Sequence, residues 1–218
     1  TGSINAPFAT IQAAITAAPS NSVIYVAPGK YEEHLIITED SITIKSIGGA
    51  EVTFMDLTIT SGTCIELADN TTIEGFTITG TDTGGTLIEL NSDDNVKILN
   101  NILDTRNGIT FGISIGASGA NDPVIMYKDF LLGSGDGAVW MQKTIVRPDV
   151  SYNRFFGQDS TSGYAIQTAG SDGGRYTNNY IEKLASGVFL HTVTSGTAGT
   201  YNELIADIII QGCGFGVR

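Results

Sequence analysis

The sequence predicts an all-β solenoid, in which one chain winds into stacked coils of parallel strands. Two observations carry this prediction. A glycine opens a similar short segment every 23 to 29 residues, at Gly62, Gly85, Gly108, Gly137, Gly163, Gly187 and Gly214. A period of this length indicates a repeat architecture. An apolar residue stands three positions after each glycine, and a polar residue stands at the fourth position in most of the first six copies. Such alternation between buried and exposed neighbours is typical of a β-strand.

The same spacing assigns side chains to the two faces of the repeated strand. The residues three positions after the glycines should form an inward column: Ile65, Ile88, Phe111, Trp140, Ile166, Leu190 and Val217. The residues four positions after the first six glycines should form an outward column: Glu66, Glu89, Gly112, Met141, Gln167 and His191. Neighbouring coils stack about 4.8 Å apart, so members of one column should lie side by side.

Residues 5–18 are predicted to form an amphipathic helix. Asn5 would cap this helix and Pro7 would lie in its first turn. Its apolar face would comprise Phe8, Ile11, Ile15 and Ala18. A solenoid exposes apolar side chains at its end, and a helix laid over that end would cover them. We therefore expect a capping helix within residues 1–22 and a solenoid over residues 23–218, together forming one domain.

A second repeated feature precedes a bend between two strands in the later coils. It consists of residues that tolerate the left-handed backbone of a tight turn. We place Asn101, Asp129, Asn153, Asn179 and Gly212 in equivalent positions. Stacked asparagine side chains also hydrogen-bond from coil to coil as a ladder. These residues are therefore expected to be structural.

Charge and hydropathy argue against two classes of partner. The chain has 11 basic and 23 acidic residues, with a formal net charge of −12 at pH 7. Nucleic acid is therefore not an expected partner, because phosphate binding requires clustered Lys and Arg. No run of 18 apolar residues occurs, so membrane insertion is not expected.

Glu66 and Glu89 are the candidates for catalysis. They are in register in the predicted outward column, which places their Cβ atoms roughly 5 Å apart. Two carboxyl groups at about 5 to 5.5 Å can act as acid and nucleophile in a retaining glycosidase. The same pair could instead contact a glycan or a metal ion, or simply face solvent. Gln167 and His191 continue the column and could contact sugar hydroxyls.

The remaining candidates are single side chains. Arg106, in the turn LDTRNG, would either pair with Asp104 on the surface or bind a uronate. Trp140 is expected in the core, and His34 lacks a partner at metal-ligand spacing. Tyrosines near coil corners, where a ring can be half exposed, are candidates for stacking on a sugar: Tyr127, Tyr152, Tyr164, Tyr176 and Tyr180.

The run PFATIQAAITAAPSNSVIYVAPGKYEEHLIIT, followed by SITIKSIGG, resembles the amino-terminal cap and first coil of the pectin lyase-like superfamily. The segments ILNNIL and YTNNYIEKLASGVFL resemble repeated coils of its carbohydrate-binding and sugar-hydrolase branch. This resemblance implies a single-stranded, right-handed parallel β-helix with three strands per coil, and with about eight coils in this chain. It does not imply one activity, because the superfamily includes lyases, esterases, hydrolases, epimerases, adhesins and phage tailspikes.

The motifs of the enzymatic branches of this superfamily are largely missing. Polygalacturonase-like enzymes combine NTD, DD, GHG and RIK motifs, and only Asp93-Asp94 matches one of them. The GxVDFIFG-type strand of pectin methylesterase-like enzymes is absent from the sequence. Pectate lyase-like enzymes hold Ca²⁺ on clustered aspartates beside an arginine, whereas the aspartates of this chain fall mainly in turns. No familiar catalytic set can be carried over.

We therefore expect an extracellular or virion-surface module, of the fibre, tailspike or adhesin kind, that binds a polysaccharide or cell-surface glycan without catalysis or a cofactor. One alternative is a glycoside hydrolase using Glu66 and Glu89, or a polysaccharide lyase that would need Ca²⁺. Another is a purely structural appendage or shell subunit.

Two expectations concern assembly. Residues 215–218 begin a new coil, which predicts further domains or a partner chain at that end. A side-by-side homotrimer is expected through an outward apolar column of Leu87, Val139, Ala165 and Phe189.

Overall fold

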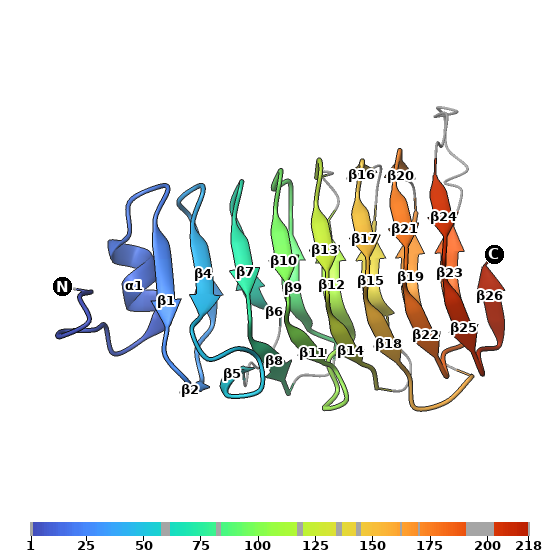
Figure 1. The fold of residues 1–218 in the computed structure, drawn as a ribbon, viewed down its shortest axis with the longest axis horizontal. Coiled ribbons are helices and arrows are strands. Elements are labelled where there is room, and N and C mark those ends of the chain that lie inside the picture. Colours follow the sequence, from blue (N-terminus) through green and yellow to red (C-terminus); the bar gives the residue numbers. More distant parts are fainter. Residues whose placement is uncertain are drawn as a thin grey trace.

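Three parallel β-sheets, wound by one chain, make up the molecule (Figure 1). The computed structural model describes residues 2–57, 62–81, 84–116, 120–133, 137–142, 145–161, 163–169, 171–190 and 203–217. Each sheet has eight strands, and the chain passes repeatedly through the sheets that we call I, II and III. The predicted fold class, a right-handed parallel β-helix, is confirmed.

The strands are short, as the closely spaced turns of the sequence require. Sheet I contains β1 (Val23–Val26), β4 (Thr43–Ser46), β7 (Thr72–Glu74), β10 (Lys97–Leu99), β13 (Val124–Met126), β17 (Asp149–Ser151), β21 (Arg175–Thr177) and β24 (Leu204–Ala206). Sheet II contains β2 (Gly29–Tyr31), β5 (Thr53–Leu57), β8 (Thr77–Gly80), β11 (Ile102–Asp104), β14 (Asp129–Leu131), β18 (Arg154–Phe156), β22 (Tyr180–Glu182) and β25 (Ile209–Gln211). Sheet III contains β3 (Leu35–Ile36), β6 (Thr63–Glu66), β9 (Thr86–Leu90), β12 (Phe111–Ile115), β15 (Gly137–Met141), β19 (Tyr164–Thr168), β23 (Ser186–Leu190) and β26 (Phe215–Val217). A two-stranded sheet pairs β16 (Ile145–Val146) with β20 (Ser171–Asp172).

The core is built from inward columns of apolar side chains, one or more from each sheet. Sheet III contributes Ile65, Ile88, Ile113, Val139, Ile166 and Val188, all fully buried and in register. Sheet II contributes Met55, Ile78, Leu103, Phe130, Phe155 and Ile181. The rings of Phe130 and Phe155 stack with their centroids 4.7 Å apart. Each coil thus buries its apolar side chains against the coils on either side.

A short helix, α1 (Ile11–Ala17), lies over the amino-terminal end of the solenoid (Figure 1). Ile11 and Ile15 are buried, as expected. The helix begins later than predicted, because Thr10 rather than Asn5 is its cap and accepts a hydrogen bond from the Ala13 amide. The Glu33 carboxylate accepts hydrogen bonds from the first free amides of the helix, those of Ile11 and Gln12. Pro7 therefore lies outside the helix.

The corner between sheets I and II carries an asparagine ladder. Asn101, Asn153 and Asn179 are buried there, and the Asn153 side-chain amide donates to the Asn179 side-chain oxygen at 3.2 Å. Each side-chain amide also donates to a backbone carbonyl of the preceding coil, that of Ile73, Ile125 or Val150. The predicted coil-to-coil ladder is confirmed.

Asp129 and Gly212, which were predicted in positions equivalent to these asparagines, do not belong to the ladder. The residue equivalent to these asparagines in the intervening coil is buried Lys128, one position before Asp129. Gly212 follows β25, at the corner between sheets II and III. The left-handed backbone itself belongs to the preceding residue of each turn, at Asn100, Tyr127, Tyr152 and Asn178.

Within the described ranges, no helix combines the length and the apolar character that crossing a membrane requires.

Candidate functional site

The outer face of sheet III brings together most of the predicted site residues. Its outward column, in register over six adjacent strands from β6 to β23, is Glu66, Glu89, Ser114, Trp140, Gln167 and Phe189. The predicted alignment of Glu66 with Glu89 is confirmed. On β23 the residue in register with Gln167 is Phe189, and the predicted column member His191 lies outside the described residues.

The distance between the glycine and the start of the strand varies among the coils, and this explains the members of the predicted columns that were wrong. Gly62, Gly85 and Gly163 immediately precede a sheet III strand, but Gly137 is itself the first strand residue, and Gly108 lies three positions before β12. Because a shift of one residue exchanges the two faces of a strand, Val139 rather than Trp140 points inward. On β12 and β23 the residues in register with Val139 and Ile166 are Ile113 and Val188, so the glycine spacing misplaced the inward column there by two residues.

The expected apolar wall for a trimer contact is also wrong. Leu87, Val139 and Ala165 are fully buried, and only Phe189 is partly exposed. The reason is that the second and third residues of these strands are both buried, so strict alternation breaks in the middle of the strand, as it does at a β-bulge. Gly112 occupies such a second position, where an added Cβ would lie 2.8 Å from the Ala138 carbonyl oxygen.

Polar side chains occupy the amino-terminal half of the outer face. Glu66 has 42% of its side chain exposed, and its Oε1 atom lies 3.5 Å from His34 Nε2. Glu89 is held differently, because its Oε2 atom accepts a hydrogen bond from the Thr63 hydroxyl on the neighbouring strand. In the part of the chain that the structure describes, no three His, Cys, Asp or Glu side chains gather in a group that could hold a metal ion.

Aromatic side chains occupy the carboxyl-terminal half of the same face. The Phe111 and Trp140 rings meet edge to face, with centroids 4.4 Å apart and planes at 76°. The Tyr164 and Phe189 rings stack, with centroids 5.5 Å apart and planes at 18°. These four residues come from the adjacent strands β12, β15, β19 and β23. We call them the aromatic ledge.

Two further contacts shape the aromatic ledge. Gly137 lies in register between Phe111 and Tyr164, and a Cβ at this glycine would come within 3.4 Å of the Phe111 ring. Gln167 lies in the outward column between Trp140 and Phe189. The ledge therefore offers half-buried rings beside a side-chain amide, a combination that can hold the apolar face and the hydroxyl groups of a sugar.

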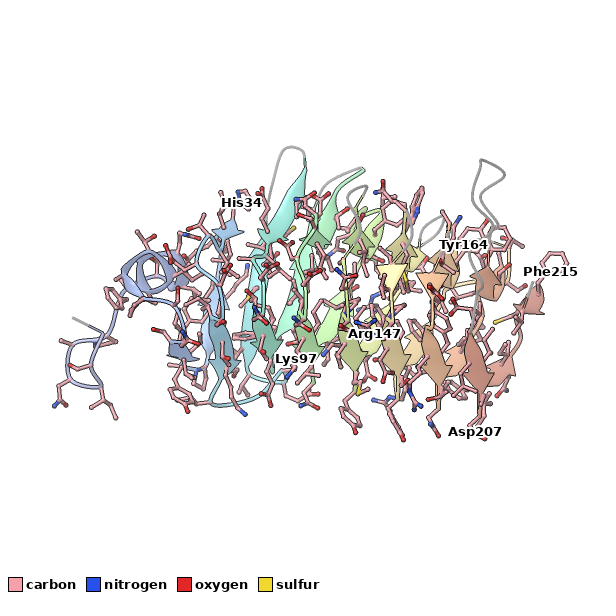
Figure 2. The ribbon with its side chains drawn as sticks, turned by 90° about the horizontal axis from the view of Figure 1, so that it is seen from above. His34, Lys97, Arg147, Tyr164, Asp207 and Phe215 are labelled. Carbon is pink, nitrogen blue, oxygen red and sulfur yellow. The ribbon has the colours of Figure 1, made fainter. Side chains whose placement is uncertain are left out.

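Not every predicted site residue belongs to this face. Arg106 follows β11 of sheet II and forms a two-point ion pair with Asp104, at 2.8 and 2.6 Å. This pairing raises the pKa of Arg106 above its ordinary value. Tyr176 is fully buried on sheet I, where burial raises the pKa of its hydroxyl, so its prediction as a half-exposed stacking residue was wrong. In Figure 2, His34 and Tyr164 lie along one edge of the molecule and Asp207 lies on the opposite edge.

Sequence reasoning missed Phe111 and Trp140 as surface residues. The signal was present locally, since Ile113 and Ile115 are apolar on either side of Ser114, and this pattern alone indicates the strand's phase. The glycine spacing indicates a different phase, because the distance from the glycine to the strand is not constant among the coils.

Comparisons with known proteins agree with this architecture. A family model described as a protein of unknown function (DUF1565) matches residues 1–40, which comprise α1 and the first coil. A search of curated proteins finds no match. A solved pectin methylesterase in complex with a hexasaccharide superposes with a TM-score of 0.63 at 11% identity, covering 94% of this chain and 92% of that chain. This chain has the pectin lyase-like fold.

Two further solved structures support the pectin lyase-like assignment. Pectin methylesterase from Yersinia enterocolitica gives a TM-score of 0.57 at 13% identity and covers 97% of this chain and 94% of that one. Pectin methylesterase from Aspergillus niger, in deglycosylated form, gives 0.53 at 15% identity, with 97% and 84% covered. At these identities the likeness concerns the fold alone.

Proposed function

We propose that this pectin lyase-like chain is an extracellular or virion-surface module that binds a polysaccharide along the outer face of sheet III without cleaving it. The observation that carries the proposal is the aromatic ledge, because two contacting pairs of rings on four adjacent strands offer a ligand stacking positions over about three strand spacings. An extended polymer suits such a surface better than a compact ligand does. The solved pectin methylesterase bound to a hexasaccharide makes a glycan a reasonable first ligand.

Two features favour binding over catalysis. The aspartate-containing strand motif of pectin methylesterase-like enzymes is absent from the sequence. The two carboxylates in register, Glu66 and Glu89, are tied to different neighbours, His34 and Thr63, instead of sharing a common partner. Paired carboxylates nevertheless make hydrolysis the second candidate function, since their strands are adjacent and Glu66 is half exposed.

The test is retention of the protein by soluble polysaccharides in affinity gel electrophoresis. Neutral and acidic polymers should be compared, with Trp140→Ala as the main variant and Tyr25→Ala as the matched control, because Tyr25 is exposed on sheet I. We expect at least one polymer to retain the wild type, and Trp140→Ala to weaken that retention about tenfold. Equal retention of both proteins would refute the proposed site.

The same polymers separate the other candidate functions. Release of reducing ends by the wild type, abolished in both Glu66→Gln and Glu89→Gln, would establish the hydrolase instead. Neither retention nor cleavage of any polymer would favour a purely structural subunit. Homo-oligomerisation stays a prediction, and the sedimentation coefficient at micromolar concentration tests it.

A further inference from the structure

A second surface, at the corner between sheets I and II, has features that the ladder alone does not explain. The corner residue with the left-handed backbone is Gly75, Asn100 or Asn178 in three of the turns, which are residue types suited to that conformation. In two successive coils it is instead a tyrosine, Tyr127 with φ 57° and Tyr152 with φ 58°. A bulky residue is a genuine outlier in this conformation, and such outliers gather at functional sites.

The two tyrosines form an exposed stack. Their ring centroids lie 5.5 Å apart with planes at 24°, and the two residues are 56% and 46% exposed. The corner residues of the two preceding coils are much smaller, namely Gly75 and Asn100. The two tyrosine rings therefore project beyond the neighbouring corner residues. Gly75 and Asn100 leave open space beside the Tyr127 ring.

That open space is a groove of about 640 Å³, lined by both tyrosines and by polar side chains of five coils. Glu74 lies in it with two partners, Lys45 at 3.0 Å and the Asn100 side-chain amide at 3.4 Å. Arg154 pairs with Asp129 at the other side. An aromatic wall beside fixed carboxylate and amide groups is the usual composition of a site that binds a sugar ring and its hydroxyls.

The charge of the groove selects among glycans. Glu51, Glu74 and Asp129 line it. Asp129 is paired with the exposed Arg154 and Glu74 with Lys45, so the lining carboxylates outnumber these cationic partners by one. Lys128 lines the groove too, but its side chain is buried and its Nζ atom has no hydrogen-bond partner in the described structure. Carboxylates in excess repel uronates and sulfated sugars.

We propose that this corner groove is a second glycan site, which binds a neutral oligosaccharide by stacking one sugar ring on Tyr127 and by hydrogen bonds to Glu74 and Asn100. It lies at the sheet I–sheet II corner, so it does not depend on the aromatic ledge of sheet III. Its ligand class is also narrower, because the excess of carboxylate over cationic groups disfavours acidic polymers.

Substitution by asparagine gives a clean test, because Asn occupies the equivalent position in the coils of Asn100 and Asn178 with the same backbone. Tyr127→Asn and Tyr152→Asn should therefore fold normally while losing the rings. The probes are soluble glucan, xylan, mannan and polygalacturonate in affinity gels, with Trp140→Ala and Tyr25→Ala proteins alongside.

We expect a neutral polymer whose retention falls about tenfold in Tyr127→Asn, stays unchanged in Tyr25→Ala, and is not abolished in Trp140→Ala. Glu74→Gln should weaken the same retention through loss of a charged hydrogen-bond acceptor. The proposal is overturned if no neutral polymer depends on Tyr127, or if polygalacturonate is the polymer that the groove variants cease to bind. Loss in Trp140→Ala alone would support the sheet III site and reject this one.

Discussion

The corner between sheets I and II and the outer face of sheet III differ in what fixes their residues. At the corner, a two-residue turn repeats in successive coils, and in three of them the buried asparagine after the left-handed residue bonds to the backbone of a neighbouring coil. On sheet III, the outward residues change from carboxylate to hydroxyl, indole, amide and phenyl along a single column. Backbone geometry dictates the first set, whereas nothing in the fold dictates the second.

The contrast indicates where function can be sought in a solenoid. Residues that the backbone requires, such as Asn153, report on folding and are uninformative about ligands. Two kinds of residue are informative about ligands. Some depart from the residue type that the backbone requires, such as the corner tyrosines, and others vary where the fold sets no requirement, such as Trp140. Substitutions in the two regions should therefore differ in their cost, and we rank them by the size of that cost.

The largest loss of stability should come from placing a carboxylate on the inward face of sheet III. Val139→Asp would place a carboxylate in the fully buried inward column and should destabilise the protein by about 4 kcal/mol or prevent folding. Trp140→Asp, one residue later, should cost much less because that side chain is partly exposed. Chemical denaturation of both variants measures the difference. Comparable losses in the two proteins would contradict the inward position of Val139 and the outward position of Trp140.

The asparagine ladder should be the next most sensitive element. Asn153→Ala removes bonds to the Ile125 carbonyl, the Lys128 amide and the Asn179 side chain, leaving buried polar groups without partners. We expect a loss of about 3 kcal/mol in the free energy of unfolding. Asn178→Gly is the matched control, since glycine accepts the left-handed backbone at that position. An Asn153→Ala protein as stable as the control would show that the ladder is not required.

A smaller effect of opposite sign, a gain in the free energy of unfolding, is expected on replacing Lys128, which interrupts the asparagine ladder. Burial lowers the pKa of its amine well below the ordinary value of 10.5, although the charge of Glu74 opposes the shift. Lys128→Asn should restore a ladder residue and stabilise the protein at neutral pH by about 1 to 2 kcal/mol. Unfolding by denaturant measures this gain.

The pH dependence of that gain follows from linkage. Between the lowered folded-state pKa and 10.5, the unfolded chain binds a proton that the folded chain does not, so the stability of the wild type rises with pH across this window. The advantage of Lys128→Asn should therefore shrink as the pH approaches 10.5. An advantage that is constant with pH would contradict the assignment of a buried, uncharged amine.

The sequence sufficed for the features that backbone chemistry imposes. The solenoid, the covering helix, the asparagine ladder and the register of Glu66 with Glu89 follow from periodicity and from the few residue types that a turn or cap accepts. The phase of β12, β15 and β23 was not predictable from glycine spacing, because Gly108 lies before its strand whereas Gly137 and Gly187 lie within theirs. Neither the Phe111–Trp140 contact nor the corner groove could be derived, since each depends on which coils become neighbours and on how far each side chain extends.

Hydroxyl-radical footprinting of the protein, with and without a polysaccharide that retains it, would test most directly whether the outer face of sheet III binds glycans. We predict that oxidation of Trp140 and Phe189 falls when the polymer is bound, while that of exposed Tyr25 on sheet I stays constant. Unchanged oxidation of Trp140 in a protein that is demonstrably bound would contradict the assignment of this face as the glycan-binding surface.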